Sequence, residues 1–254
     1  MGAMDEIVDA VVAQQAELTG LLDGLDDRGW ARPSPCDGWD VADVVLHLVQ
    51  TNLMAEASLG DRLDAFYAEQ LEGARPAANV DDGAAAMVEL HRGAPNEELL
   101  GRWRTGAARL SDLLLAEDPG RRVTWVAGTL SPRTLATTRL AETWIHTGDV
   151  AEALGVELAP SDRLEHIARL AWRTLPYAFE RAGRSLGGPV AFELTGPGGQ
   201  PWSFVPDEPA RTTISGPATD LCGVAARRLD PATTRLVADG PDGDAVLELV
   251  RTYA

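Results

Sequence analysis

The chain has 254 residues, 45% of them hydrophobic and 24% charged, which is a composition typical of folded rather than disordered proteins. It contains 22 Lys and Arg residues against 39 Asp and Glu residues, so its net charge at neutral pH is −17. Phosphate-rich surfaces repel such a protein, and no run of basic residues offsets the negative charge. The composition therefore argues against nucleic acid and anionic membranes as partners.

The two cysteines, Cys36 and Cys222, are far apart in the sequence, and neither belongs to a Cys-x-x-Cys pair. This spacing predicts neither a disulfide framework nor a zinc knuckle. The N-terminal segment MGAMDEIVDAVV lacks the basic region and the apolar core of a signal peptide, and no apolar run is long enough to cross a membrane. We expect a cytoplasmic protein that is a monomer or a homodimer.

Hydrophobic residues recur every three or four positions up to about residue 184, which predicts a series of amphipathic helices. The expected helices span about 5–27, 41–59, 60–73, 84–91, 96–117, 132–155 and 161–183. Pro176 is expected to kink the last of them. The segment 117–132 contains Pro and Gly and is expected to be a long irregular connection.

Two of these helices have clear start and stop signals. Asp40 can cap the helix that begins at residue 41, with Asp43 three residues further on in an approximate capping box. The Ser131-Pro132 pair places a proline in the first turn of a later helix, and Gly155 suits its left-handed C-cap. The ends of both helices are therefore predicted by local chemistry as well as by hydrophobic spacing.

After Gly187 the spacing of apolar residues changes from the period of a helix to that of a strand. The strand candidates span 189–194, 201–205, 211–215 and 234–239, and the helix candidates span 218–229 and 244–253. We therefore expect a helical bundle over residues 1–184 and a small α+β domain over residues 185–254.

Three polar residues share one face of the helix expected over 132–155. At 100° per residue, Glu142, His146 and Asp149 fall opposite the side that carries Leu140 and Leu154. Spacing alone favours a solvent-exposed face with a weak Glu–His pair. Two ligands one turn apart also suit a divalent metal, provided that a third ligand arrives from elsewhere.

His47 is the candidate for that third ligand. It lies in the helix expected over 41–59, beside the apolar residues Val44 and Leu48. A single histidine in this position is more often a satisfied core residue than a metal ligand. The residues alone therefore leave the metal site open.

Two segments resemble the signatures of one protein family. SPCDGWDVADVVLHL resembles the Pro-x-x-Gly-Trp-x-Val-x-Asp-hydrophobic-hydrophobic-x-His-Leu signature of the mycothiol-dependent maleylpyruvate isomerase proteins, a branch of the DinB-like four-helix metalloproteins. LAETWIHTGDVAEALG resembles their second signature, a Glu-x-x-x-His helix that is followed by an aspartate and ends in Ala-Leu-Gly. The segment GPATDLCGVAARRL and the tail resemble their C-terminal domain. The resemblance implies a mainly α, DinB-like four-helix bundle followed by a smaller C-terminal α+β domain.

Carried over residue by residue, the resemblance makes His47, Glu142 and His146 the ligands of a divalent metal, and zinc is the metal we expect. Three protein ligands leave a coordination position open, as in catalytic zinc sites. Asp149 would then orient an imidazole or a metal-bound water, and its alternative interpretation is a solvated carboxylate.

Two further positions carry predictions from the same comparison. Arg227 or Arg228 lies where the family has an arginine that faces the active site, and we favour Arg227 as the catalytic residue. Cys36 precedes a helix in a Pro-rich loop, and we interpret it as a half-buried small residue rather than a nucleophile.

In this family a low-molecular-weight thiol, mycothiol, adds to a conjugated substrate and leaves again after bond rotation. The resemblance therefore implies a metal-dependent isomerase or S-transferase that acts on a small electrophilic substrate, with mycothiol as co-substrate. Two alternatives remain open. One is a thiol-independent isomerase or cyclase that uses the same pocket, and the other is a non-catalytic protein that binds a metal or a ligand.

Overall fold

The structure is a computed structural model that describes residues 2–73, 77–126 and 128–252. It divides into two compact units, Met1–Leu158 and Ala159–Ala254. The first unit is almost entirely helical, and the second contains a mixed sheet with helices. The expected fold class, a helical bundle followed by a smaller α+β domain, is confirmed. Among the described residues, none of the helices has the length and apolar character needed to span a bilayer.

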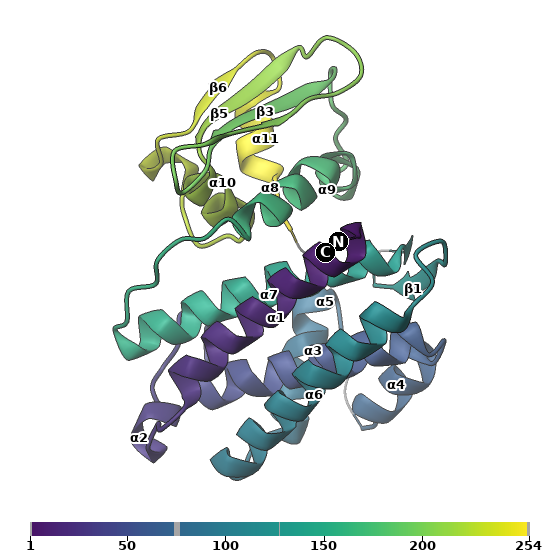
Figure 1. The fold of residues 1–254 in the computed structure, drawn as a ribbon, viewed down its shortest axis with the longest axis vertical. Coiled ribbons are helices and arrows are strands. Elements are labelled where there is room, and N and C mark those ends of the chain that lie inside the picture. The colour runs from purple at the N-terminus through teal and green to yellow at the C-terminus, as the bar shows by residue number, and fades with distance from the viewer. Residues whose placement is uncertain (1, 74–76, 127, 253–254) are drawn as a thin grey trace. The chain divides into compact units, whose positions relative to one another are not determined.

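Four long helices form the bundle of the first unit (Figure 1). They are α1 (Ala3–Leu22), α3 (Val41–Leu59), α6 (Asn96–Ala116) and α7 (Pro132–Leu154). Helices α1 and α3 each pack against both α6 and α7, so the four helices close around a common core. The shorter elements of this unit are α2 (Asp27–Trp30), α4 (Leu63–Gln70), α5 (Val80–His91), β1 (Val123–Trp125) and β2 (Gly128–Leu130).

The bundle core is formed by the apolar stripe that the sequence pattern predicts on α3. Val44 and Leu48 are buried and belong to a cluster that also contains Leu18 of α1 and Trp103 of α6. Trp103 has no exposed surface, and its indole Nε1 donates a hydrogen bond to Thr19 Oγ1 at 3.0 Å. The largest core side chain is therefore satisfied both in packing and in hydrogen bonding.

The two helices that carry the candidate ligands begin at well-defined points. Asp40 Oδ1 accepts a hydrogen bond from the backbone N–H of Asp43 at 2.9 Å, and the Asp43 side chain completes the predicted capping box. The Ser131 hydroxyl accepts from the backbone N–H of Thr134 at 3.2 Å at the start of α7. Gly155 ends α7 with a φ of 70°, as its predicted left-handed cap requires.

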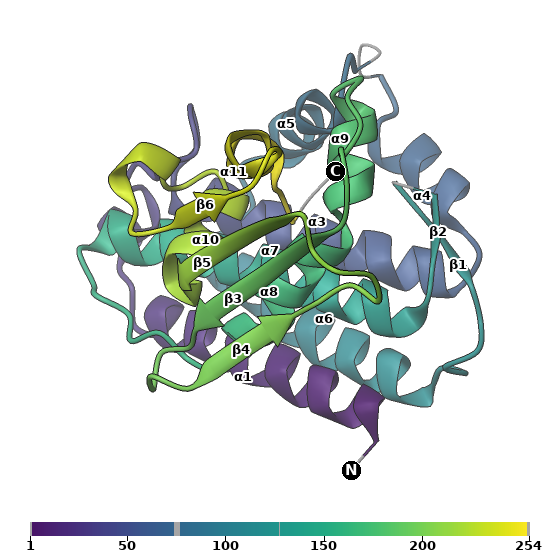
Figure 2. The same cartoon turned by 90° about the horizontal axis from the view of Figure 1, so that it is seen from above.

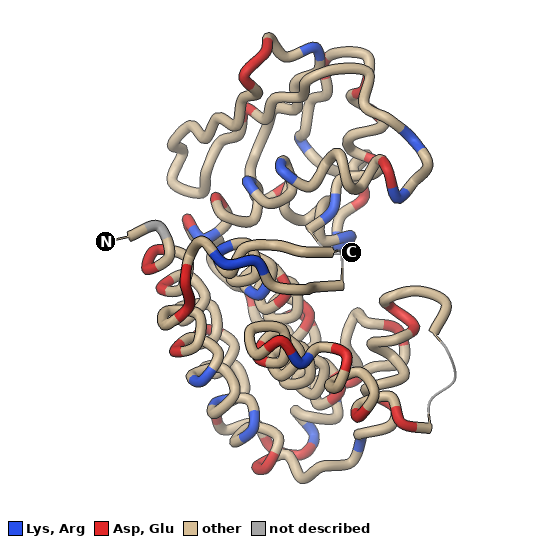
Figure 3. Tube along the Cα trace, turned by 90° about the vertical axis from the view of Figure 1, so that its right-hand side faces the viewer, with Lys and Arg blue, Asp and Glu red and all other residues tan. Residues whose placement is uncertain are grey.

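Charged side chains on the outside of the bundle form separate pairs. Arg102 bonds to Glu98 one turn away, and Arg104 of α6 bonds to Asp23 at the end of α1. In the view of Figure 3, basic residues are scattered among the acidic ones along the bundle helices. Exposed pairs of this kind contribute about 0–1 kcal/mol each, so the fold depends mainly on its core.

The structure differs from the sequence-based expectation at several places in the first unit. Helix α4 spans Leu63–Gln70 rather than 60–73, and α5 begins at Val80 rather than near residue 84. The first helix ends at Leu22 rather than near residue 27, and Gly24 follows with a φ of 78°. The segment expected to be irregular contains a short antiparallel hairpin, in which Val123 pairs with Leu130. This hairpin was missed because each strand has three residues, too few for an alternating pattern. Residue 127 lies outside the described residues.

The second unit is built on a four-stranded sheet with the order β4-β3-β5-β6 (Figure 2). Its strands are β3 (Val190–Thr195), β4 (Pro201–Phe204), β5 (Thr212–Pro217) and β6 (Val237–Asp239). The hairpin β3–β4 and the pair β5–β6 are antiparallel, whereas β3 and β5 run parallel. All four strands lie where the sequence predicts them.

The helices of the second unit explain where the two units divide. They are α8 (Leu164–Arg173), α9 (Leu175–Arg181), α10 (Ala218–Ala225) and α11 (Gly243–Leu249). The sequence places the boundary at residue 184, where the hydrophobic period changes. Because α8 packs on α10 and α9 packs on α11, the structure groups residues 159–184 with the sheet instead.

Two expected helices of the second unit also differ from their sequence patterns. The helix expected over 161–183 is interrupted at Thr174. Pro176 explains this break, because it lacks an N–H and its ring collides with the preceding turn. Helix α11 ends at Leu249, and Tyr253, the last residue expected in it, lies outside the described residues.

Candidate metal centre

The structure brings His47, Glu142 and His146 together inside the bundle. His47 lies on α3, whereas Glu142 and His146 lie one turn apart on α7, which packs against α3. His47 Nε2 is 2.7 Å from Glu142 Oε1, and His146 Nε2 is 3.5 Å from the same oxygen. One nitrogen or oxygen atom from each residue lies within 4.8 Å of the other two. Residues 95 positions apart thus converge on a single point.

These three side chains are removed from solvent. The exposed fractions of His47 and His146 are 6% and 8%, and the Glu142 side chain retains 18%. The imidazole rings are 4.8 Å apart and nearly perpendicular. The Glu142–His146 pair is therefore not the solvated helix face that spacing alone favours.

Burial and hydrogen bonding determine the charges in the cluster. Burial lowers the pKa of His47, although its hydrogen bond to Glu142 acts in the opposite direction. Burial alone would raise the pKa of Glu142, but its hydrogen bonds with His146 and His47 hold that pKa well below the usual range. The cluster therefore contains an ionised carboxylate and one imidazole, that of His47, that favours the neutral form.

The pKa of His146 shifts in the opposite direction to that of His47. Burial acts to lower its pKa, but hydrogen bonds to Asp149, Cys36 and Glu142 outweigh burial and raise the pKa well above its ordinary value. Without a metal, His146 is a cation next to Glu142. A metal bound at His146 Nε2 takes the place of one proton.

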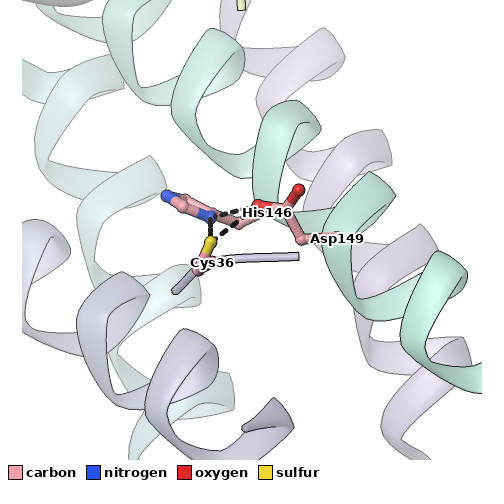
Figure 4. A group of neighbouring side chains, drawn as sticks. All are labelled: Cys36, His146 and Asp149. Atoms are coloured by element: carbon pink, nitrogen blue, oxygen red, sulfur yellow. Dashed lines mark hydrogen bonds and ion pairs between the residues drawn. The ribbon is translucent and has the colours of Figure 1, made fainter. Parts of the chain in front are cut away.

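Asp149 and Cys36 contact the other side of the His146 ring (Figure 4). Asp149 Oδ2 lies 2.9 Å from His146 Nδ1 and accepts a hydrogen bond from Cys36 Sγ at 3.2 Å. Asp149 is 2% exposed, so the alternative of a solvated carboxylate does not describe it. A hydrogen bond from Nδ1–H to Asp149 selects the tautomer whose Nε2 lone pair points toward Glu142 and His47.

The donor set fits a divalent metal of the zinc type. Two imidazole nitrogens and one carboxylate oxygen are ligands that zinc accepts, and three protein ligands leave a position for a further molecule. Cys36, His146 and Asp149 also lie close enough together to hold an ion. His146 could serve both groups through its two ring nitrogens, but the Nδ1–Asp149 contact already occupies one of them.

Arg139 lies one turn before Glu142 on α7, and its Nη2 is 3.8 Å from Glu142 Oε2. It is 3% exposed and lies over the ring of Trp125, at 5.4 Å from the ring centroid. Arg139 is a buried residue of this cluster that was not predicted from the sequence. Arg139 precedes Glu142 by three positions, and residues three apart share a helix face. This spacing could have indicated that the two side chains lie together.

Cys36 is half-buried, as the sequence analysis expects, but its contact with Asp149 was missed. The contact arises because the loop before α3 folds back on itself. Trp39 bonds to Cys36 through its backbone N–H, and Pro33 pairs with Asp40. No periodicity in the sequence reports a loop contact of this kind.

Arg227 and Arg228 lie in the second unit, immediately after α10. Arg227 has a φ of 60°, and its Nη1 donates a hydrogen bond to the backbone oxygen of Glu248 at 2.7 Å. Arg228 Nη1 bonds to the backbone oxygen of Ala226 at 3.2 Å. The catalytic role of Arg227 stays a prediction.

Comparisons with known proteins bear on the family of this chain. Residues 11–151 match the family model described as the mycothiol maleylpyruvate isomerase N-terminal domain. Two proteins described as uncharacterized, from the CDC 1551 and H37Rv strains of Mycobacterium tuberculosis, are each 36% identical over 245 residues, covering 95% of this chain and 93% of the relative.

Solved structures share the fold over nearly the whole length. The crystal structure of the mycothiol-dependent maleylpyruvate isomerase has a TM-score of 0.61 at 16% identity and covers 92% of both chains. A mutant of that isomerase gives the same TM-score at 17% identity. At this identity the likeness shows the fold, while the match to the family model and the relatives show the family. The chain belongs to the mycothiol maleylpyruvate isomerase family.

Proposed function

We propose that this protein is a zinc-dependent enzyme that uses a low-molecular-weight thiol, mycothiol, to isomerise a small electrophilic substrate or to transfer the thiol to it. The observation that carries the proposal is the convergence of His47, Glu142 and His146 at one buried point. Family membership supports the thiol, since the solved relative is named as mycothiol-dependent. The thiol and the substrate would meet in the cytoplasm.

The residues of the site have separate tasks in this proposal. His47, Glu142 and His146 would hold the metal, which when bound supplies a cation that keeps a thiol ionised at neutral pH. Asp149 holds the proton at His146 Nδ1 and so keeps Nε2 available as a ligand. Burial of the cluster excludes water, which protects a thiolate from competing protonation and strengthens each charge interaction.

Asp149 and Arg227 are the proposed catalytic contributors beyond the metal ligands. Asp149 would act by orienting His146, because its carboxylate reaches the ring at 2.9 Å. Arg227 would bind a charged group of the substrate or the thiol. Arg227 is exposed, so a ligand can reach its guanidinium, and the hydrogen bond from Nη1 to the backbone oxygen of Glu248 holds the side chain in place.

The first test is metal content. We expect the purified wild type to bind about one equivalent of zinc and the His146→Ala variant to lose most of it, because two ligands cannot hold the ion tightly. His91→Ala is the matched control, since His91 is exposed at the end of α5 and bonds to the backbone of Gln70. Mass spectrometry of the metal after dialysis gives the answer. A His146→Ala variant that retains all of its zinc would refute the ligand assignment.

The second test is the pH dependence of zinc binding. The pKa of His146 is raised in the metal-free protein, so the ring is protonated at neutral pH and must lose its proton when zinc binds. Zinc affinity should therefore rise with pH, by about tenfold per unit for one released proton, until the pH passes the raised pKa. Competition with a chromophoric chelator between about pH 6 and 8 measures this slope.

Asp149→Asn provides the control for the pH test. Removing the carboxylate lowers the pKa of His146, so the rise of affinity should level off at a lower pH than in the wild type. The variant should also bind zinc about 10- to 100-fold more weakly at high pH, because the imidazole is no longer oriented. Identical pH profiles for the two proteins would contradict the assigned role of Asp149.

The third test addresses the thiol. We expect the zinc-loaded protein to convert small conjugated electrophiles only when mycothiol is present, with the product detected by chromatography and mass spectrometry. His47→Ala should abolish the conversion, whereas His91→Ala should not. Conversion without thiol would favour a thiol-independent isomerase or cyclase. Zinc binding without any conversion would favour a non-catalytic binding protein.

A further inference from the structure

Arg139 is a buried cation that the proposed metal chemistry does not use. It is 3% exposed and lies on the same face of α7 as Glu142. Tyr67 of α4 is close enough that the charge of Arg139 counteracts the rise that burial causes in the pKa of Tyr67. Residues from α4, β1 and α7 thus surround the guanidinium.

Two of the three guanidinium nitrogens of Arg139 have no hydrogen-bond partner within residues 2–73, 77–126 and 128–252. Nε and Nη1 are buried, and neither has a hydrogen-bond partner among the residues that the structure describes. Nη2 approaches Glu142 Oε2 at 3.8 Å, which is an ion pair but too long for a hydrogen bond. Trp125 covers a face of the group, and a cation–π contact leaves the N–H bonds in the guanidinium plane unused.

Burying an arginine with unpaired N–H groups costs free energy of folding unless a hydrogen-bond acceptor binds to them. Buried donors lose their water and are normally hydrogen-bonded, and arginine cannot escape the penalty by losing its proton at neutral pH. Arg121 shows the ordinary arrangement in this chain, because it bonds to both Glu117 and Asp61. In the described part of the chain, Nε and Nη1 of Arg139 have no such partners, so both can donate to an acceptor from outside the protein.

Metal binding would also leave the positive charge of Arg139 less compensated. In the described part of the chain, Glu142 is the carboxylate that forms an ion pair with Arg139. When Glu142 ligates a divalent cation, its negative charge is shared with that cation, and the guanidinium loses most of its counter-charge. A small anion between the metal and Arg139 would restore the balance.

We propose that Arg139 is a specificity-determining residue that binds a carboxylate of the substrate beside the metal. This inference rests on the proposed function, because it concerns the ligand of the same site. The planar carboxylate matches the chemistry of the guanidinium, which donates in its own plane and forms charge-assisted hydrogen bonds. The substrate carboxylate therefore accepts from the unpaired donors of Arg139, and an uncharged electrophile of the same size binds more weakly.

The test follows the Arg139 side chain directly by NMR of the ¹⁵N-labelled protein, in both zinc-loaded and metal-free forms. A buried Nε–H exchanges slowly enough to be observed, and Arg139→Lys identifies its signal by removing it. Acetate is the probe, and acetamide is its uncharged counterpart of similar shape. We expect acetate to shift the Arg139 Nε–H signal and acetamide to leave it unchanged.

Backbone amide shifts in the same spectra give the affinity for acetate. Arg139→Met should weaken acetate binding by at least about tenfold, and Arg139→Lys should retain part of it, because the charge remains but the planar donors do not. Arg133→Met is the matched control, since Arg133 also lies on α7 but is exposed. The affinity of this variant for acetate should equal that of the wild type. If Arg139→Met does not fold, the wild-type Nε–H response and the Arg139→Lys affinity still decide.

The outcomes separate this inference from the proposed function. If the protein binds zinc normally but acetate does not shift the Arg139 Nε–H signal, the inference is wrong and the proposed metal site is unaffected. A protein that takes up no zinc but shows the Arg139-dependent acetate response overturns the proposed function and supports the inference. Equal acetate affinity in the wild type and Arg139→Met also overturns the inference, because the anion would then bind elsewhere.

Discussion

The packing of α3 against α7 is the constraint on which the site depends. His47 comes from one helix and Glu142 and His146 from the other, so the three ligand atoms meet only if both helices keep their register. That register is fixed by the apolar stripe of α3 in the bundle core and by caps at the start of each helix. A shift of one residue would turn a ligand by about 100° and destroy the cluster. The packing of the bundle core therefore also determines the geometry of the candidate metal centre.

The interior of the bundle contains more polar and charged groups than packing alone would tolerate. Asp149 satisfies His146, whereas His47 Nδ1 and two nitrogens of Arg139 have no partner among the described residues. Buried groups of this kind reduce stability, and they persist where function requires them. The solved relatives share the fold at 16% and 17% identity. The bundle fold thus brings the three candidate ligands together, and in our proposal Arg139 sets what the site accepts.

Sequence patterns predicted the elements that build the site but not all of its contacts. Asp40 and Ser131 identified the starts of α3 and α7, because capping chemistry is local. Spacing placed Glu142 and His146 on one face, yet it could not show that this face is buried, since burial depends on the partner helix. The link to His47 came from resemblance to a family, because pairing across 95 residues leaves no periodic signal. The Cys36–Asp149 contact was missed for the same reason, as it depends on how a loop folds back.

The most direct test of the account is X-ray absorption at the zinc edge on the protein loaded with zinc in the absence of added thiol. The account predicts a first shell of nitrogen and oxygen donors at about 2.0–2.2 Å, with the multiple-scattering pattern of two imidazoles and no sulfur. A sulfur donor at about 2.3 Å would contradict it, because the metal would then lie at Cys36 rather than between His47, Glu142 and His146.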